Sequence, residues 1–588
     1  MSLNPDDGSN PDDGSLTPGG RRSRRRIVLI SGLVVVVLLA AGVTAFVLKK
    51  QSDERSATRA TRAARSAAAA YLSAWTAVDA ASPAATSAPS ASPSTSPSGA
   101  AAATPAPTSA ALAAQARLSS ALVADTATVP AVVNAITTSR DHLQLTAATY
   151  TAGTLSRQGS TATVPYHASL TLAGLAGAFT YDGSLTLRRT SGEWKVAARP
   201  DAVYPTLAAG QHLGRTTSTA ARGKIVDRTG NELSDDTELS GNLVGAATPT
   251  PTGLQRVYNA RLTPSGGAVV IAGATNHVVR QLRAYPMADG QDVSTTLDLN
   301  VQRAGEAALA PLTQNAALVA IDTTTGGLLA IVNHPLNGYG RAVRGTYAPG
   351  STFKIITATA ALMSGKTANT PLDCSDKVEV EGRTFQNAES EKFGKISLSE
   401  AFAKSCNTAF INLEKSLPAG ALTQAARLYG FDAAGTGPLP ITSFGGSFPA
   451  PSDAVAAAAS AIGQAQVEAS PVQMASVAAA VASGTWRQPF VTGTAPASHP
   501  LPAGVAPALR GFMREVVTSG TAAAVKFPGV VYGKTGTAEY GTANPPKTNA
   551  WFVGYRGTVA FAVIVEDGGF GADTAAPAAA RFLTALGG

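Results

Sequence analysis

A serine and a lysine stand three residues apart in the run Tyr347-Ala-Pro-Gly-Ser-Thr-Phe-Lys354. Pro349 and Gly350 interrupt the structure before them, and the apolar residues that follow predict a helix with Ser351 in its first turn. The spacing puts the Ser351 hydroxyl and the Lys354 amine on one helix face. A lysine whose pKa is lowered by burial or by a neighbouring cation can take the proton of such a serine. The helix N-terminus adds N–H groups where negative charge would develop, although most isolated Ser-x-x-Lys motifs are only solvated surface.

A second polar motif, Ser405-Cys-Asn407, lies among helix-forming residues between Leu398 and Leu413. The Asn407 amide suits contact with a substrate amide, and the Ser405 hydroxyl can pass a proton between the lysine and a leaving amine. A helix cap is the simpler interpretation of the same triplet.

The third motif is Lys534-Thr535-Gly536-Thr537, and the apolar run before it, residues 530–532, predicts a strand. A glycine within a strand often marks the close approach of another backbone, and here a cation and two hydroxyls lie beside it. This pattern suits a bound peptide that ends in a carboxylate, although an ordinary β-bulge has the same sequence.

The order Ser-x-x-Lys, Ser-x-Asn, Lys-Thr-Gly is the motif set of penicillin-binding proteins and serine β-lactamases. Residues 291–586 resemble the transpeptidase domain of class B penicillin-binding proteins, and we assign residues 291–588 to it. Flanking segments extend the resemblance: residues 294–298, 470–474, 533–539 and 550–554. Predicted strands at both ends of this region, with helices between them, indicate an α+β fold in which helices pack an antiparallel sheet, as in serine β-lactamases.

The resemblance implies a peptidoglycan D,D-transpeptidase whose substrate, a stem peptide, ends in D-alanyl-D-alanine. Ser351 would attack the penultimate carbonyl, Lys354 would be the first choice of general base, and Ser405 would return a proton to the departing D-alanine. The implied substrate-binding residues are Asn407, Lys534, Thr535, Gly536 and Thr537. The backbone N–H groups of Ser351 and Thr537 would form the oxyanion hole. An amine of a second stem peptide would resolve the acyl-enzyme, and β-lactams would be trapped at the same serine.

Other functions stay open from the sequence. A D,D-carboxypeptidase would use the same residues, whereas a class A β-lactamase needs a Glu-x-x-Leu-Asn stretch, and the local match at residues 414–417 continues with Pro418. A membrane-anchored β-lactam receptor or a division-complex scaffold is a further alternative, but residues 1–26 are too few for a cytoplasmic output module. No segment resembles a glycosyltransferase domain. We therefore expect a monofunctional enzyme, with a glycosyltransferase or a division or elongation complex as a partner.

An uncharged apolar run of 22 residues, Ile27 to Leu48, is long enough as a helix to cross a bilayer. Five arginines precede it and two lysines follow it, which favours a cytoplasmic N-terminus. A cleaved signal peptide is the competing interpretation, but the run is long and lacks an obvious cleavage site. We therefore expect a single-pass protein of the cell membrane with its catalytic domain outside the cytoplasm.

The net charge of +8 could indicate nucleic acid as a partner, yet much of the excess flanks the apolar run. No basic patch with interleaved aromatic residues appears elsewhere, so nucleic acid is not expected. The six histidines are scattered, and neither a metal nor another cofactor is expected. The two cysteines, Cys374 and Cys406, either form a disulfide in an oxidising compartment or remain buried thiols.

Three smaller parts precede the catalytic region. Residues 1–26 predict a disordered cytoplasmic tail, and residues 82–109 a low-complexity linker rich in Pro, Ser, Thr and Ala. The linker interrupts residues 55–205, which predict a cone-like α+β domain similar to the nuclear-transport-factor-like domain of penicillin-binding proteins associated with methicillin resistance. Residues 212–290 predict a small pedestal, or dimerisation, domain, because residues 222–230 and 253–258 resemble segments of that region in class B members.

The prediction for the cone-like domain depends on the periodicity of its residues. An amphipathic helix is expected over Ser56 to Ala80, and a second helix near residues 110–123. Apolar residues alternate strictly from Ala162 to Leu172 and again around Trp194, with Asp182-Gly183 as the expected turn between two strands. A curved antiparallel sheet behind one or two helices follows.

Overall fold

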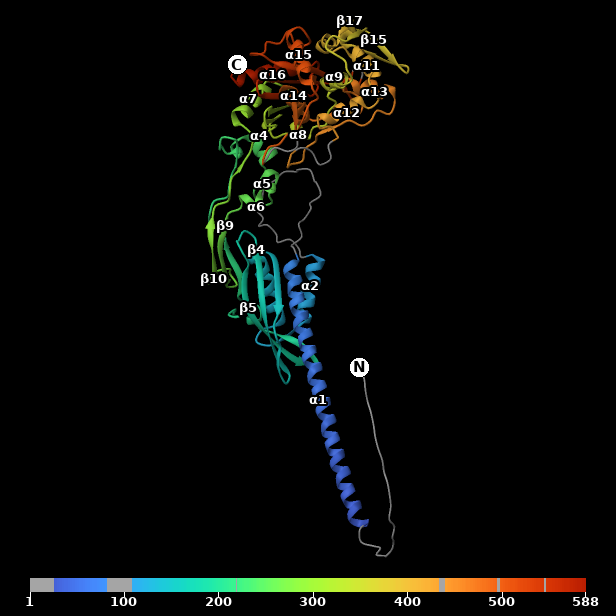
Figure 1. Cartoon of the computed structure of the whole chain (residues 1–588). Coiled ribbons are helices and arrows are strands. Elements are labelled where there is room, and N and C mark those ends of the chain that lie inside the picture. The colour runs from blue at the N-terminus through green and yellow to red at the C-terminus, as the bar shows by residue number, and fades with distance from the viewer. Residues whose placement is uncertain are drawn as a thin grey trace, which may run out of the picture. The chain divides into compact units, whose positions relative to one another are not determined.

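The computed structural model describes residues 26–81, 108–217, 219–432, 439–493, 498–543 and 546–587 (Figure 1). Its contacts divide the chain into two compact units, residues 1–217 with 267–285 and residues 218–266 with 286–588. The predicted pedestal therefore contributes strands to both units. The predicted tail up to residue 25, and the predicted linker from residue 82 to residue 107, lie outside the described residues.

The first helix, α1 (Arg26–Ala80), contains the predicted membrane span, and the side chains of residues 26–39 are outside the described part of the chain. Within the part that is described, no helix combines the length and the apolar character needed to cross a membrane. A membrane span at residues 27–48 stays a prediction. The second half of α1 is the expected amphipathic helix, with Tyr71 and Trp75 among its buried residues.

The first unit is a sheet with three helices. The helices after α1 are α2 (Ser109–Ser120) and α3 (Val129–Leu143). The strands are β1 (Leu122–Ala124), β2 (Leu145–Ala152), β3 (Ser156–Gln158), β4 (Thr161–Leu172), β5 (Phe179–Thr190) and β6 (Glu193–Ala198). Their order is β1-β6-β5-β4-β2, with β3 paired to β4, and α1 packs against this sheet (Figure 1). The burial of β4 alternates residue by residue, as its sequence predicts.

The turn predicted at Asp182-Gly183 is wrong, because both residues lie inside β5. Gly183 pairs directly with Tyr166 of β4, and a Cβ at Gly183 would lie 2.3 Å from the Tyr166 ring. Glycine is needed there because the aromatic ring crosses the neighbouring backbone. The strands are instead joined through residues 173–178, where Gly174 and Gly177 adopt positive φ.

Short elements connect this sheet to the catalytic region. One three-stranded sheet has the order β10-β9-β7, formed by β7 (His212–Thr217), β9 (Ser265–Ala272) and β10 (Val278–Ala288). In the second unit, β8 (Ile225–Val226) pairs in parallel with β11 (Val293–Ser294). The short helices nearby are α4 (Thr237–Leu239), α5 (Gly253–Val257) and α6 (Asn259–Leu262).

The second unit is built around a five-stranded antiparallel sheet of the order β13-β12-β24-β23-β22. Its strands are β12 (Ala316–Asp322), β13 (Leu328–His334), β22 (Tyr532–Tyr540), β23 (Lys547–Arg556) and β24 (Val559–Val565). Strands from both ends of the catalytic region thus meet in one sheet, as predicted. The strand with the third motif, β22, is an edge strand, so one side of its backbone is free to meet another element.

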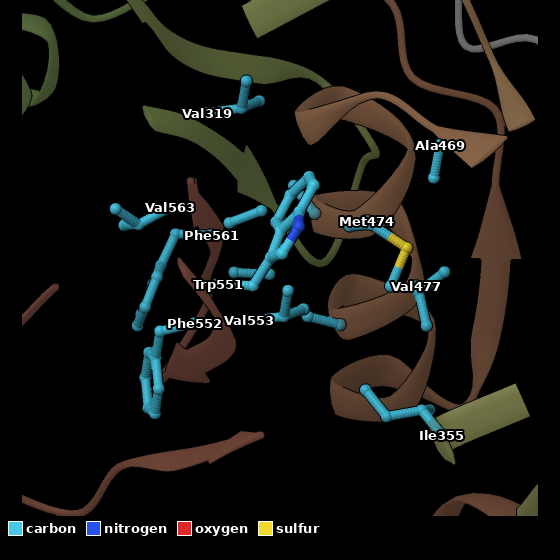
Figure 2. Close-up of a cluster of buried hydrophobic side chains, with 14 of the residues drawn as sticks. Val319, Ile355, Ala469, Met474, Val477, Trp551, Phe552, Val553, Phe561 and Val563 are labelled. Carbon is cyan, nitrogen blue, oxygen red and sulfur yellow. The ribbon is translucent and has the colours of Figure 1, made fainter. Parts of the chain in front are cut away.

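Helices cover both faces of this sheet. On one face, α14 (Pro471–Ser483) packs against β24, β12 and β23, and its Met474 and Val477 belong to the same buried cluster as Trp551 of β23 (Figure 2). On the other face, Phe552 and Phe561 stack on each other beneath α7 (Leu299–Leu309) and α16 (Ala575–Ala585). Successive side chains of β23 point to opposite faces of the sheet, so this one strand contributes apolar residues to the core under each helical layer.

The remaining elements lie in the helical part between the two halves of the sheet. The helices are α8 (Arg341–Arg344), α9 (Lys354–Met363), α10 (Leu398–Ala403), α11 (Asn407–Lys415), α12 (Ala421–Leu428), α13 (Ala454–Ala461) and α15 (Val505–Thr518). The short strands are β14 (Pro371–Cys374), β15 (Lys377–Val380), β16 (Arg383–Gln386), β17 (Gly394–Ser397), β18 (Gly446–Ser447), β19 (Glu468–Ala469), β20 (Thr485–Arg487) and β21 (Ser498–Pro500).

Candidate active site

Ser351 lies in a 3₁₀ turn, η4 (Gly350–Phe353), and α9 begins directly after it at Lys354. The prediction placed Ser351 in the first α-helical turn, so the tighter turn is a small correction. Gly350 has a φ of +52°, and a Cβ there would lie 2.5 Å from the carbonyl oxygen of Thr537. The turn therefore lies directly against the edge strand β22, and only a glycine at position 350 allows this approach.

The side chain of Lys354 is completely buried and points at the first two motifs. Its Nζ lies 3.0 Å from Ser351 Oγ and 3.3 Å from Ser405 Oγ. It donates to the Ser405 carbonyl oxygen at 2.6 Å and to Asn407 Oδ1 at 2.7 Å. A neutral amine has two hydrogens, and these two oxygens accept both of them. The nitrogen lone pair is then left for the proton of Ser351.

The helix predicted through Leu398 to Leu413 is broken at the second motif. Helix α10 ends at Ala403, α11 begins at Asn407, and Ser405 between them has a φ of +58°. A serine in the left-handed region cannot continue a helix. The break turns both the carbonyl and the hydroxyl of Ser405 toward Lys354.

Cys406, the middle residue of the second motif, forms a disulfide with Cys374 at the end of β14. The sequence left a disulfide and free thiols equally open, and the structure shows the disulfide. The bridge ties the turn of the second motif to a strand outside it.

The third motif contributes Lys534, Thr535, Gly536 and Thr537 from β22. Lys534 is completely buried, and its Nζ donates to Ser405 Oγ at 2.9 Å. The Thr535 hydroxyl is 2.6 Å from that of Thr521, a residue that the motif search did not single out. Thr521 stands in an ordinary Gly-Thr-Ala triplet, which carries no sequence signal of its own.

The edge position of β22 leaves a row of backbone groups facing the nucleophile. The N–H and the C=O of one residue point to the same side of an antiparallel strand. Because the Thr537 carbonyl lies toward Gly350, the Thr537 N–H also faces the turn of Ser351. The two predicted donors of an oxyanion hole therefore lie on facing elements.

Burial dominates the electrostatics of both lysines. It holds the pKa of Lys354 well below its usual value, and the nearby charge of Lys534 lowers this pKa further. Burial also lowers the pKa of Lys534 to about 7. A lysine with a strongly lowered pKa is available as a base near neutral pH.

Residues of all three motifs, but neither of the two buried lysines, line a cleft of about 1430 Å³. Its lining includes Ser351, Ser405, Asn407, Thr535 and Thr537. All three predicted motifs thus meet at one concave surface. Among the described residues, no group of three or more His, Cys, Asp or Glu side chains is placed to hold a metal ion.

The chain is similar to several known proteins. Residues 316–584 match the family model of the penicillin binding protein transpeptidase domain. The chain is 30% identical over 339 residues to the peptidoglycan D,D-transpeptidase PbpA of Mycobacterium tuberculosis, a match that covers 47% of this chain and 68% of the relative. It is 33% identical over 352 residues to PbpA of Mycolicibacterium smegmatis, covering 48% and 68%.

Solved structures show the same likeness. The ceftriaxone acyl-enzyme complex of penicillin-binding protein A from M. tuberculosis matches with a TM-score of 0.53 and 25% identity, over 63% of this chain and 99% of that chain. Its penicillin G acyl-enzyme complex matches with a TM-score of 0.52 and 25% identity, over 62% and 99%.

Proposed function

This chain belongs to the family of penicillin-binding protein transpeptidases, and on that premise we propose that Ser351 is its nucleophile and Lys354 its general base. The protein is a serine-type peptidoglycan D,D-transpeptidase, an acyltransferase that β-lactams also acylate. One observation carries the residue assignment: the buried amine of Lys354 lies 3.0 Å from Ser351 Oγ, while two closer acceptors, the Ser405 carbonyl oxygen at 2.6 Å and Asn407 Oδ1 at 2.7 Å, can take the two hydrogens of its neutral form.

Acylation begins when Ser351 Oγ attacks the carbonyl carbon of the penultimate D-alanine. The hydroxyl proton passes to Lys354 Nζ as the new C–O bond forms, and the carbonyl oxygen becomes an oxyanion. The backbone N–H groups of Ser351 and Thr537 stabilise this charge. Loss of one such donor typically costs on the order of 10² to 10³ in rate.

The intermediate collapses when the C–N bond to the terminal D-alanine breaks. The leaving nitrogen takes a proton from Ser405 Oγ, which is replenished by Lys354 at 3.3 Å. Lys534 holds the Ser405 hydroxyl in place at 2.9 Å. An amine of a second stem peptide then attacks the ester, and the same residues return the proton to Ser351.

Substrate is held by the walls of the cleft. The cation of Lys534 and the hydroxyls of Thr535 and Thr537 suit the terminal carboxylate of the donor peptide. One N–H of the Asn407 amide donates to the Gln386 carbonyl at 3.0 Å, which leaves the second for the peptide amide of the substrate.

We propose that the segments before residue 291 anchor the chain in the membrane and hold the active site near the cell wall. Residues 27–48 would anchor the chain in the cell membrane with residues 1–26 in the cytoplasm, which the flanking charges support. The first unit, a sheet with helices, would be a nuclear-transport-factor-like spacer, and residues 212–290 would include a reduced pedestal. A glycosyltransferase or a division or elongation complex would be the partner that supplies glycan strands.

A transfer assay tests the function. The full-length protein is given a stem-peptide mimic that ends in D-alanyl-D-alanine together with an amine acceptor, and cross-linked product is compared with free acid. We expect cross-linked product to exceed free acid, and both to vanish in Ser351→Ala. Free acid alone at saturating acceptor would identify a D,D-carboxypeptidase instead.

A further inference from the structure

We propose that Asn387, a residue outside the three motifs, is a positioning residue for this reaction: it fixes the turn that presents Ser405 and Asn407 to Lys354. The inference rests on the function proposed above and adds to it a residue that lines the cleft but whose side-chain amide is bonded within the protein. Asn387 follows β16 directly and is only 4% exposed.

The amide oxygen of Asn387 caps a helix from a distant part of the chain. Asn387 Oδ1 accepts the N–H of Asn407 at 2.8 Å and that of Thr408 at 3.1 Å. These are the first two residues of α11, whose N–H groups have no partner within the helix. The N-cap residue itself is Cys406, and its sulfur, a weak acceptor, accepts a single backbone N–H of the helix, that of Ala409 at 3.4 Å. Asn387 therefore supplies the oxygen that a serine or an aspartate would normally provide.

The amide nitrogen of Asn387 is also fixed by hydrogen bonds. Its Nδ2 donates to the carbonyl oxygens of Ser375 at 2.8 Å and Glu391 at 2.9 Å. Both amide hydrogens are used, so the side chain cannot turn over without losing four hydrogen bonds. The capping oxygen thus has one fixed direction.

The turn that Asn387 caps is strained and needs outside support. Ser405 is held at a φ of +58°, a conformation that persists only where its surroundings fix it. The neighbouring residue, Gln386, accepts from the Asn407 side chain at 3.0 Å. Residues 386 and 387 therefore hold the backbone and the side chain of Asn407 together. Both acceptors of Lys354, the Ser405 carbonyl and Asn407 Oδ1, depend on this support.

The disulfide keeps the chain in place when this cap is removed. Cys406 remains bonded to Cys374 in an Asn387 variant, so α11 stays near its site while the register of the turn loosens. A misplacement of about 1 Å at a catalytic group costs on the order of 10²-fold in rate. Loss of the cap should therefore slow the acylation reaction more clearly than it disturbs the folded structure.

The test compares the second-order rate constant of acylation by a fluorescent penicillin in the full-length protein and three variants. Asn387→Leu keeps the approximate volume and removes every hydrogen bond of the side chain, and we expect acylation to slow by about 10- to 100-fold. Asn387→Asp keeps an oxygen for the two N–H groups, and burial against the carbonyls of Ser375 and Glu391 favours its protonated carboxyl, whose single O–H replaces one of the two lost donations. We therefore expect Asn387→Asp to react faster than Asn387→Leu and slower than the unsubstituted protein. The total amount of label at completion gives the competent fraction, so the rate constant refers to folded molecules only.

Asn333→Leu is the matched control. Asn333 is buried like Asn387 and accepts the N–H of Ala342 at the start of the short helix α8 at 2.7 Å, and its side-chain hydrogen bonds go to Glu238 and Ala342, which lie outside the three motifs. We expect its acylation rate constant to be unchanged even where its unfolding temperature falls.

The proposal is overturned if Asn387→Leu reacts as fast as the unsubstituted protein, or if Asn387→Asp is as slow as Asn387→Leu. An equal fall of the acylation rate constant in Asn333→Leu would also overturn the proposal, because loss of any buried asparagine would then slow the reaction. Absence of labelling in the unsubstituted protein would instead refute the proposed function, and the two failures are distinguishable.

Discussion

Lys534 donates to the hydroxyl of Ser405 across 2.9 Å, and this contact joins the edge strand β22 to the turn between α10 and α11. The same hydroxyl lies 3.3 Å from Lys354. Two buried lysines therefore share one serine, and the charge of Lys534 makes the protonated form of Lys354 less favourable. The pH dependence of the reaction follows from this arrangement.

The acylation rate should rise with pH as Lys354 loses its proton and level off well below the ordinary lysine pKa of 10.5. In Lys534→Met the second charge is gone, so the pKa of Lys354 rises and the acid limb moves to higher pH. Lys404→Met removes a cation at the cleft that does not contact Lys354, and should leave the acid limb in place. The measurement is the rate of penicillin acylation across pH. An acid limb that stays fixed in Lys534→Met would show that the two lysines are not coupled.

Gly463→Ala should slow acylation by displacing the nucleophile turn. Gly463 has a φ of +72°, and a Cβ there would lie 2.2 Å from the carbonyl oxygen of Gly350. Gly504→Ala is the control, because Gly504 has a φ of +79° and nothing within 4 Å of the added atom. Both variants carry the same backbone strain, of order 1 kcal/mol. Equal acylation rates in the two would contradict the close packing of the nucleophile turn.

Removal of the disulfide should lower stability and loosen the second motif. Cys374 and Cys406 close a loop with a sequence separation of 32 residues, for which the chain-entropy model gives roughly 3–4 kcal/mol. We expect a lower unfolding temperature and slower acylation in the Cys374→Ser, Cys406→Ser double variant. Intact mass after alkylation, with and without reductant, checks the starting state: alkylation of two thiols before reduction would rule the bridge out.

In the first unit, Asp79 should make stability fall as pH rises. Tyr150 donates to Asp79 Oδ2 at 2.6 Å, and burial raises the pKa of Asp79 from 3.8 to about 7. The folded state then binds more protons than the unfolded chain between these two values, so the free energy of unfolding decreases with pH across this window, by at most about 1.4 kcal/mol per pH unit. Thermal unfolding of Asp79→Asn should lack this slope. A slope that persists in Asp79→Asn would assign it to another group.

The parts of the fold that depend on local sequence patterns could be predicted. The alternation from Ala162 to Leu172 predicted β4 close to its observed bounds, Thr161–Leu172. The three motifs could be found because each has an unusual set of polar residues. Their meeting at one cleft followed from the family resemblance and not from any local property of the chain.

Features set by tertiary contacts could not be predicted. The left-handed Ser405 looks like helix in sequence, and its conformation depends on Asn387 and the disulfide. Gly183 looks like a turn residue, but the ring of Tyr166 requires it within a strand. Asn387 itself is an ordinary asparagine after a short strand, and only the four short hydrogen bonds of its side chain distinguish it.

The most direct test of the central claim maps the covalent adduct formed with penicillin. Trypsin cleaves after Arg344 and Lys354, so residues 345–354 form one peptide that contains Ser351 as its only serine. We predict the penicilloyl mass on this peptide, with fragment ions that place it on Ser351, and no adduct anywhere in Ser351→Ala. An adduct on another residue, or labelling that survives in Ser351→Ala, would contradict the account.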